Sequence, residues 1–513
     1  MVSTVVDIIR TQATSDRAAL VFEEREISYR ALDTRSSQVA QAMRGAGVNA
    51  GDRVAFLDKN RPEYFELLFG AAKLSAVCVC VNWRLAPREV LQVVADAAAT
   101  VLFVGSDLVD RVEQIEELLP GTLVVSLDGH DRWVAYESWI GSHPAEDPGL
   151  PSANEDIALQ LYTSGTTGTP KGAMLSNRNF FAMAKATAPV WGFHPGMTSI
   201  GVSPLFHIAG TGWNLMVMSF GGTVVLHREV DGEAILRDIG RYRVTHAILV
   251  PAILQLILAR RNQGSADPSS LETVVYGASP ISDRVLLELF AAFDCKFMQG
   301  YGLTETSGAV TTLRAEDHDP SRPDLLRSCG QPLDGVEMRI VDPESGVDCD
   351  DGGVGEVWIR SAQVMTGYWR NRAATAEAID ADGWFRSGDA GYLRDGRLYL
   401  HDRVKDMIVS GAENIYPAEV ENALMSHPGV AEVAVIGVPH ERWGETVKAI
   451  IVRAPDATVT EAEIIAHARA NLAHYKCPNS VDFVVELPRN ATGKVLKRTL
   501  REPHWQGHDR RIG

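Results

Sequence analysis

Cysteine is scarce in this chain, with six residues scattered over 513 positions. A small secreted scaffold held together by disulfides is far richer in cysteine. Cys78 and Cys80 lie close together, but no other metal-ligating residues gather near them in the sequence, so a zinc site is not indicated. We expect reduced, mostly buried thiols.

Long apolar runs are also lacking. None reaches the roughly 18 residues that a membrane-spanning helix needs. The N-terminal stretch 1–17 contains Asp7 and lacks the basic start and apolar core of a signal peptide. We therefore expect no membrane span and a cytoplasmic location, while peripheral contact with a membrane stays open.

Positive charge is in deficit, because 49 Lys and Arg residues face 66 Asp and Glu residues and the formal net charge is −17. This balance argues against a nucleic-acid partner, since phosphate backbones are bound by clustered Lys and Arg. A small anionic ligand is still compatible, because backbone N–H groups and a few cations can hold phosphate inside an acidic protein. The sequence leaves open whether the protein is a monomer or a homodimer.

Apolar residues, in contrast, are plentiful at 45% of the chain, a typical share for a globular protein. A chain of 513 residues is too long for one ordinary core, so at least two domains are expected. Wholly apolar strands alternate with amphipathic helices over most of the chain, which is typical of parallel sheets covered by helices on both faces. The expected strands include 54–57, 76–81, 101–104, 223–226, 246–250 and 273–276.

The pattern changes towards the C-terminus. From about residue 327 short strands and turns predict a small β-barrel-like part, and the charged, glycine-rich stretch 389–406 indicates a boundary. A compact α+β region follows. The predicted fold is α/β, with a large N-terminal domain (1–403) of doubly wound sheets plus the barrel-like part, and a smaller C-terminal domain (404–513).

One segment is dense in potential phosphate ligands. Residues 162–172 read Tyr-Thr-Ser-Gly-Thr-Thr-Gly-Thr-Pro-Lys-Gly and follow an apolar run at 157–161. Hydroxyls and glycine N–H groups are donors for phosphate oxygens, and Lys171 adds a cation. The spacing excludes a Walker A loop, in which Gly-Lys is followed by Ser or Thr. On its own the segment would also suit a flexible surface turn.

Further segments carry groups that a nucleotide and a reacting acid would need. In 299–305, Tyr301 offers an aromatic face, Thr304 a hydroxyl donor and Glu305 a hard oxygen ligand for Mg²⁺. Taken alone, this segment would suit a turn at the end of a strand with an acidic cap. The stretch 276–280 follows a predicted strand just before it.

Three charged residues nearer the C-terminus stand in polar turns. Asp389 ends 384–389, Arg403 follows Asp402, and Lys494 ends 490–494. Each also fits a plain surface position, since an isolated turn aspartate or a solvated basic face looks the same in sequence.

In this order, and over nearly the whole chain, these segments resemble the adenylate-forming superfamily of acyl- and aryl-CoA synthetases, peptide-synthetase adenylation domains and luciferases. The overall pattern is most similar to the fatty acyl-CoA synthetases. The resemblance implies ATP, Mg²⁺ and coenzyme A as co-substrates or cofactors. The residues it implies for ATP and AMP are Thr163, Ser164, Gly165, Thr166, Thr167, Gly168, Lys171, Gly277, Ala278, Ser279, Gln299, Gly300, Tyr301, Gly302, Thr304, Asp389 and Arg403.

The resemblance also implies catalytic roles. Lys494 would bind the reacting carboxylate and the α-phosphate, where a cation lowers the barrier for two anions to meet. Thr304 would meet the α-phosphate, Glu305 would bind Mg²⁺, and His207 would lie near the carboxylate. Lys405 would be the hinge about which a mobile C-terminal domain turns between two half-reactions. Asp402 stands where the family usually has glycine, so the local turn before Arg403 is expected to differ.

The acid and thiol sites follow from the resemblance less directly. Phe206-His207 matches an aromatic–histidine pair where amino-acid-activating members carry Asp, which argues against an amino acid; a purely structural His207 stays open. The implied acyl-pocket residues are Phe206, His207, Gly210, Thr211, Trp213 and Asn214. The implied coenzyme A contacts are Ser410, Gly411, Glu413, Lys448 and Lys476.

The expected reaction is ATP-dependent activation of a carboxylic acid to acyl-AMP and pyrophosphate, then transfer to coenzyme A with release of AMP. A medium- or long-chain fatty acid is the first expectation for the acid. An aryl or alicyclic acid, delivery to a carrier protein instead of coenzyme A, and a non-catalytic nucleotide-binding protein of the same fold stay open.

Overall fold

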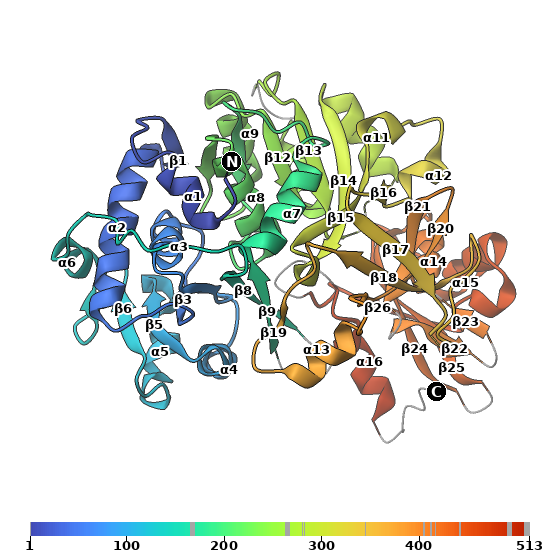
Figure 1. Cartoon of the computed structure of the whole chain (residues 1–513). Coiled ribbons are helices and arrows are strands. Elements are labelled where there is room, and N and C mark those ends of the chain that lie inside the picture. The colour runs from blue at the N-terminus through green and yellow to red at the C-terminus, as the bar shows by residue number, and fades with distance from the viewer. Residues whose placement is uncertain are drawn as a thin grey trace. The chain divides into compact units, whose positions relative to one another are not determined.

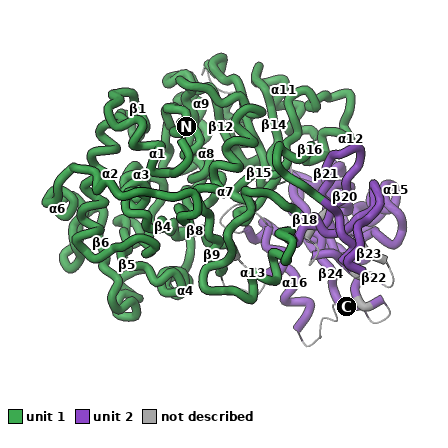
Figure 2. Tube along the Cα trace, in the orientation of Figure 1, with its two compact units in different colours: residues 1–338, 359–385 green, residues 339–358, 386–513 purple. Residues whose placement is uncertain are grey.

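The computed structural model describes residues 2–164, 170–261, 267–279, 281, 283–343, 345–403, 406–410, 413–415, 417–440, 443–489 and 495–506. The chain forms two compact units (Figure 2). Unit 1 comprises Met1–Met338 and Ile359–Phe385, and unit 2 comprises Arg339–Trp358 and Arg386–Gly513. The predicted boundary between residues 403 and 404 separates a large domain from a mobile C-terminal domain. It stays a prediction.

Unit 1 contains a nine-stranded sheet, sheet A (Figure 1). Its strand order is β16 (Gln331–Pro332), β15 (Gly308–Leu313), β14 (Lys296–Leu303), β13 (Thr273–Gly277), β12 (His246–Leu249), β10 (Thr198–Gly201), β11 (Thr223–Leu226), β1 (Ala18–Phe22), β2 (Arg25–Ser28). The six strands from β14 to β1 are parallel, and β2, β15 and β16 add antiparallel edges.

A second sheet of unit 1, sheet B, has eight strands. Their order is β19 (Gly367–Tyr368), β9 (Pro170–Ser176), β8 (Ile157–Ser164), β4 (Val77–Cys80), β3 (Arg53–Leu57), β5 (Ala99–Val104), β6 (Leu123–Ser126), β7 (Val134–Ala135). The strands from β8 to β7 are parallel, whereas β9 pairs antiparallel with β8 and β19.

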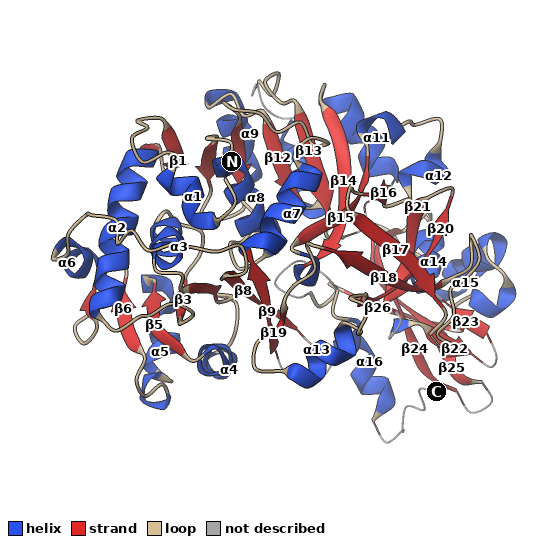
Figure 3. Ribbon diagram, viewed as in Figure 1, coloured by secondary structure: helices blue, strands red, loops and turns tan. Residues whose placement is uncertain are grey.

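Helices cover both faces of each sheet in unit 1 (Figure 3). On sheet B the strand alternation decides the contacts: Ala55 and Leu57 pack with α4, whereas Phe56 meets Tyr64 of α3 at 5.2 Å between ring centroids. Helices α9 to α11 share a buried cluster with sheet A. The helices of unit 1 are α1 (Val5–Arg10), α2 (Tyr29–Gly45), α3 (Glu63–Lys73), α4 (Pro87–Ala97), α5 (Val109–Glu113), α6 (Tyr136–Gly141), α7 (Asn177–Thr187), α8 (Ile208–Ser219), α9 (Gly232–Arg241), α10 (Pro251–Arg261), α11 (Asp283–Ala292), α12 (Pro323–Leu326) and α13 (Arg372–Ala378).

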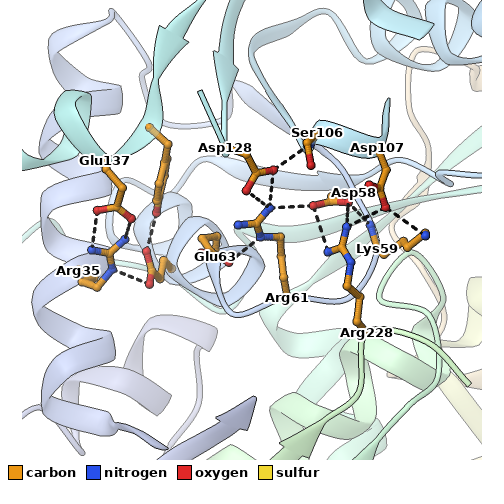
Figure 4. A network of polar contacts seen from close by, with 12 residues as sticks. Arg35, Asp58, Lys59, Arg61, Glu63, Ser106, Asp107, Asp128, Glu137 and Arg228 are labelled. Atoms are coloured by element: carbon orange, nitrogen blue, oxygen red, sulfur yellow. Dashed lines mark hydrogen bonds and ion pairs between the residues drawn. The ribbon is translucent and has the colours of Figure 1, made fainter. Parts of the chain in front are cut away.

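An ion-pair network joins the two sheets of unit 1 (Figure 4). Asp58 follows β3 of sheet B, and its fully buried carboxylate accepts from Arg61 at 3.0 Å and from Arg228, which follows β11 of sheet A, at 3.1 Å. A Cβ on Gly105 would lie 2.1 Å from this carboxylate, so only glycine fits there. Arg228 also pairs with Asp107 at 3.1 Å. Charges from loops far apart in sequence therefore compensate one another at this junction.

Unit 2 contains most of a four-stranded sheet and all of a five-stranded one. The first has the order β17 (Val336–Val341), β18 (Gly355–Ser361), β20 (Phe385–Arg394), β21 (Arg397–Arg403). The second has the order β23 (Glu413–Ile415), β22 (Ile408–Ser410), β25 (Gly444–Arg453), β24 (Val430–His440), with β26 (Ser480–Val484) parallel to β25. Its helices are α14 (Pro417–Met425), α15 (Glu461–Asn471) and α16 (Lys497–Trp505).

The predicted α/β fold is confirmed. The apolar stretch 76–81 contains the fully buried strand β4. Ser28 caps α2 by accepting from the Ala31 N–H at 3.1 Å. Strands predicted at 223–226 and 273–276 are β11 and β13. Within the described ranges, no helix is both long enough and apolar enough to cross a membrane.

Candidate active site

The hydroxyl-rich segment lies on a β-hairpin of unit 1. Strand β8 runs through to Ser164 and β9 begins at Pro170, so Thr163 and Lys171 are direct cross-strand partners. Opposite residues of an antiparallel pair point to the same face. The first residue of the motif, Tyr162, donates instead to Asp96 at 2.6 Å, and burial raises the pKa of its phenol. Gly165, Thr166, Thr167 and Gly168 lie outside the described residues.

Glu305 meets this hairpin. The residue lies in η3 (Thr304–Thr306), just after β14 of sheet A, and its side chain is buried. Its Oε1 accepts one hydrogen bond from Thr163 Oγ1 at 3.1 Å and another from the Tyr368 hydroxyl at 2.9 Å. Thr304 adjoins Glu305 in the same turn. The structure thus brings the beginning of the 162–172 motif and the end of the 299–305 motif together.

Tyr368 was missed in the sequence. It lies on the two-residue strand β19, which pairs with β9 so that Tyr368 stands opposite Ala173. The position diagonal to it on the same face is Lys171, whose Nζ lies 5.2 Å from the Tyr368 ring centroid. The only sequence signal near Tyr368 is the stretch Thr-Gly-Tyr-Trp at 366–369. Aromatic residues beside glycine are too common to identify a site.

Two glycine-containing segments share the carboxyl end of the parallel strands in sheet A. Gly277 and Gly300 are partners on β13 and β14, and a Cβ on Gly277 would come within 2.2 Å of the Gly300 carbonyl oxygen. A Cβ on Gly302 would likewise lie 1.9 Å from the Gly308 carbonyl oxygen. Ala278 has a positive φ of 65°, a strained conformation for a residue with a Cβ. Ligands of open parallel sheets bind at this edge.

The remaining predicted nucleotide residues of this region surround the same strand ends. Gln299 donates weakly to the Cys329 sulfur at 4.0 Å, while its backbone carbonyl accepts from Thr312 Oγ1 at 2.8 Å. Tyr301 is half-buried on β14, and Ser279 is half-buried after β13.

His207 directly precedes α8, and its side chain is partly buried beside Phe206. Burial and the nearby charge of Arg84 lower its pKa to about 4, so the imidazole is neutral at pH 7. Its ring lies 4.3 Å from that of Phe206, and its Nε2 has no hydrogen-bond partner among the described residues. A neutral imidazole nitrogen without a partner is available for a hydrogen bond to a ligand.

The predicted acyl-pocket residues on α8 are all buried. Thr211 donates to the Leu205 carbonyl at 2.5 Å, and Trp213 donates to Ser199 Oγ at 2.8 Å. Gly210 packs against the Pro204 carbonyl, which would lie 2.2 Å from a Cβ. The Asn214 amide has no partner for either polar atom within the described residues. These contacts account for packing, and the acyl-pocket role stays a prediction.

Asp389 and Arg403 are neighbours in unit 2. They are direct partners of the antiparallel pair β20–β21, and Asp389 is buried. The Asp389 N–H donates to Ser387 Oγ at 3.0 Å, and the adjacent Gly388 N–H donates to Glu356 Oε1 at 2.9 Å. The two residues are fourteen positions apart in sequence, and the hairpin turn at 395–396 brings them opposite each other.

The predicted coenzyme A lysines already have carboxylate partners. Lys448 Nζ contacts Asp482 at 2.8 Å, and Lys476 Nζ contacts Glu419 at 2.7 Å. Burial of the Lys476 ammonium group lowers its pKa, but the hydrogen bond and charge of the Glu419 carboxylate raise it by more. The pKa of Lys476 is therefore raised. Ser410 of β22 pairs with Glu413 of β23. Lys405, Gly411 and Lys494 lie outside the described residues.

The chain matches known proteins over most of its length. Residues 9–369 match the family described as AMP-binding enzyme, and residues 419–494 match the AMP-binding enzyme C-terminal domain. The chain belongs to the AMP-binding enzyme family. The predicted resemblance to the adenylate-forming superfamily is thereby confirmed.

Individual relatives of this AMP-binding enzyme differ in what they are named for. A fatty acid–[acyl-carrier-protein] ligase, ScoC of Streptomyces coeruleorubidus, is 38% identical over 503 residues, covering 96% of this chain and 95% of its own. A feruloyl-CoA synthase of an Amycolatopsis species is 39% identical over 479 residues, 93% of each chain. The crystal structure of ATP-bound MatB from Rhodopseudomonas palustris has a TM-score of 0.90, with 28% identity and 99% of both chains covered.

Membership of the AMP-binding enzymes confirms the predicted enzyme class, an acid–thiol ligase of the acyl-CoA synthetase type, and the use of ATP and Mg²⁺. Coenzyme A is the acceptor for which relatives such as the feruloyl-CoA synthase are named. The residues present fit Mg²⁺, because the Glu305 carboxylate is a hard oxygen ligand held in place by the Thr163 and Tyr368 hydroxyls. When bound, Mg²⁺ supplies positive charge to polyphosphate oxygens.

Proposed function

We propose that this AMP-binding enzyme is an acid–CoA ligase that activates a medium- or long-chain fatty acid. The supporting observation is the convergence of Thr163, Lys171 and Tyr368 on one face of the β8–β9–β19 ladder, with Glu305 bonded to two of them. A cation, hydroxyl donors and an oriented carboxylate on neighbouring backbones suit a polyphosphate and its metal ion.

In the proposed first half-reaction, a carboxylate oxygen of the acid attacks the α-phosphorus of ATP. The bond from that phosphorus to the oxygen bridging to the β-phosphorus breaks, and pyrophosphate leaves with its electron pair. Lys171 and Thr163 hold the leaving phosphates, and Lys494 neutralises the charge that builds up between the two anions.

In the proposed second half-reaction, the thiol of coenzyme A gives up its proton and its sulfur attacks the acyl carbonyl carbon. The carbon–oxygen bond to AMP breaks, and acyl-CoA is released. The thiol proton passes to solvent, because burial lowers the pKa of His207 to about 4 and makes its imidazole a weak base. The neutral ring can still orient the thiol by accepting a hydrogen bond from it. Rotation about Lys405 brings the second set of residues to the acyl-adenylate.

Several features support an apolar acid. Helix α8 carries no charged side chain from Ile208 to Ser219, and Phe206 with His207 precedes it in place of a carboxylate that would bind an amine. One relative is named for a fatty acid at 38% identity.

An aromatic acid is the second candidate. The Trp213 ring centroid lies 5.9 Å from that of Trp191 and 5.0 Å from that of Phe193, so aromatic rings surround this side chain. A relative named feruloyl-CoA synthase is 39% identical to this chain. Delivery to a carrier protein is the alternative for the thiol, because the ScoC relative is named for it. The cytoplasmic location and the choice between monomer and homodimer stay predictions.

Pyrophosphate release with a panel of acids tests the proposal. We expect the highest kcat/KM for saturated acids of medium or long chain, with acyl-CoA formed only when coenzyme A is added. A preference for ferulate-type acids would replace the fatty acid by the aromatic one. Acylation of a holo-carrier protein, but not of coenzyme A, would replace the proposed thiol.

A further inference from the structure

Three potential metal ligands converge on unit 1 away from the hairpin and the glycine segments. They are His194 in the turn after α7, His246 at the first position of β12, and Glu272 immediately before β13. One ligand atom from each lies within 4.8 Å of those of the other two. Strands β12 and β13 are adjacent in sheet A (Figure 1), so two of the ligands are held by hydrogen-bonded neighbours.

His246 contributes one ring nitrogen to this group. Its side chain is fully buried, and its Nε2 has no hydrogen-bond partner of ordinary geometry among the described residues, although the backbone of Trp191 and Gly192 lies close. Its Nδ1 contacts Thr245 Oγ1 at 2.9 Å. Because the Thr245 hydroxyl donates its own proton to the Thr198 carbonyl at 3.1 Å, Nδ1 must be the donor to Oγ1. The lone pair of a neutral imidazole therefore lies on Nε2.

His194 is oriented in the same way. Its Nδ1 lies 3.0 Å from the Pro195 carbonyl, which can only accept, so Nδ1 carries the proton. Its Nε2 faces Glu272 Oε2 at 3.2 Å. Without a cation, this contact requires a second proton on the ring. With a metal ion, both Nε2 and Oε2 act as ligands and no second proton is needed.

We propose that His194, His246 and Glu272 bind a divalent transition metal ion of the zinc class, with water at the fourth position. Two imidazoles and one carboxylate are a donor set for Zn²⁺, whereas Mg²⁺ and Ca²⁺ prefer oxygen ligands alone. Each imidazole has its other nitrogen fixed by a hydroxyl or carbonyl acceptor, the arrangement that commonly orients metal-bound histidines. Zn²⁺ bonds of about 2.0–2.2 Å place tetrahedral ligand atoms about 3.4 Å apart, so the three ligand atoms, which lie within 4.8 Å of one another, move closer when the ion binds.

Access and position define the role of the site. The side chains of His194 and Glu272 are 41% and 54% exposed, which leaves a path for the ion. His246 and Glu272 lie at the amino ends of parallel strands, whereas Gly277 lies at the carboxyl end of β13. The site is therefore at the opposite edge of sheet A from the predicted nucleotide residues. Its expected effect is to fix the turn after α7 to the sheet, independently of adenylation.

The full chain, stripped of metal by a chelator and kept free of ATP and Mg²⁺, provides the test. Zn²⁺ is titrated by competition with a chromophoric chelator, and Co²⁺ serves as an optical probe of the ligand geometry. We expect about one Zn²⁺ per chain, a visible Co²⁺ spectrum of four- or five-coordinate type, and a higher Tm with Zn²⁺.

Two exposed-ligand variants and one control identify the ligands. His194→Ala and Glu272→Gln are expected to weaken Zn²⁺ binding by more than about tenfold, the loss seen even for residues that only orient a ligand. His130→Ala is the control, because His130 contacts Glu113 at 3.3 Å without a third ligand. It is expected to bind Zn²⁺ as the unaltered protein does. His246 is kept, since a fully buried position tolerates substitution poorly.

The metal-free Tm of each variant shows whether it is folded, and pyrophosphate release with Mg²⁺ shows whether adenylation is intact. No Zn²⁺ binding by the unaltered protein would overturn the proposal. So would equal affinity in all four proteins, which would indicate an adventitious ion at another position.

Discussion

Thr163 Oγ1 donates a 3.1 Å hydrogen bond to Oε1 of Glu305, across 142 positions of sequence. Thr163 is the penultimate residue of β8 in sheet B, and Glu305 follows a strand of sheet A. The bond therefore unites two motifs that sequence spacing alone leaves separate. It also fixes the orientation of a carboxylate suited to Mg²⁺, since a bonded carboxylate loses rotational freedom.

Glu305→Gln should reduce adenylation strongly while leaving the fold intact. The amide oxygen can still accept from Thr163 and Tyr368, but it lacks the charge that a metal ligand needs. We expect kcat/KM for pyrophosphate release to fall by about a hundredfold or more, a loss typical of a charge-stabilising group. Glu316→Gln, at an exposed position eleven residues further along the chain, should change neither activity nor Tm. Full activity of the Glu305 variant would remove this residue from the metal site.

Tyr368→Phe removes one donor and keeps the ring beside Lys171. A hydrogen bond to a charged group contributes about 1.5–3 kcal/mol, so kcat/KM should fall by roughly ten- to a hundredfold. The Mg²⁺ concentration for half-maximal activity should rise with it, because Glu305 is less well oriented. Tyr242→Phe, on a different face of unit 1, is the matched control. An unchanged Mg²⁺ dependence would mean that the Tyr368 hydroxyl only stabilises the fold.

Features that depend on neighbouring residues could be predicted from the sequence, whereas features that depend on the pairing of distant segments could not. Apolar strands such as β4 and the capped helix α2 follow from local patterns. The motifs at 162–172 and 299–305 predict a nucleotide site through their resemblance to the adenylate-forming superfamily. Tyr368 could not be found, because β19 has two residues and its place depends on pairing with β9, almost 200 positions away. The same holds for Lys476 and Glu419, an ion pair formed by tertiary packing.

The charge of Lys494 should matter for the first half-reaction alone. Lys494→Ala is expected to lower pyrophosphate release by about a hundredfold or more, since the approach of two anions loses its cation. Transfer from added acyl-AMP to coenzyme A should persist. Lys497→Ala removes a nearby lysine that is paired with Glu421 at 2.9 Å and should leave both half-reactions intact. Full pyrophosphate release by the Lys494 variant would contradict its assignment.

His207 should make the protein more sensitive to acid. Its folded pKa of about 4 lies below the unfolded value of about 6.5, so the unfolded chain takes up a proton first as the pH falls. Stability from this group is complete above pH 6.5 and declines towards pH 4, by about 2 kcal/mol at pH 5. Urea denaturation at pH 7 and pH 5 should show a smaller loss for His207→Gln than for the unaltered protein. An identical loss in both would mean that His207 is already protonated in the folded state.

Gly302→Ala should disturb the strand end that carries Tyr301. The new Cβ would lie 1.9 Å from the Gly308 carbonyl oxygen and 2.7 Å from Ala309 Cα, and these backbone atoms of β15 leave no room for it. Overpacking of this kind costs about 1–3 kcal/mol, so we expect a lower urea midpoint together with a raised KM for ATP. Gly141→Ala is the control, because no atom lies within 4 Å of a Cβ there and its φ is not positive. If the Gly302 variant kept both the midpoint and the KM, the close pairing of β14 with β15 would not constrain the site.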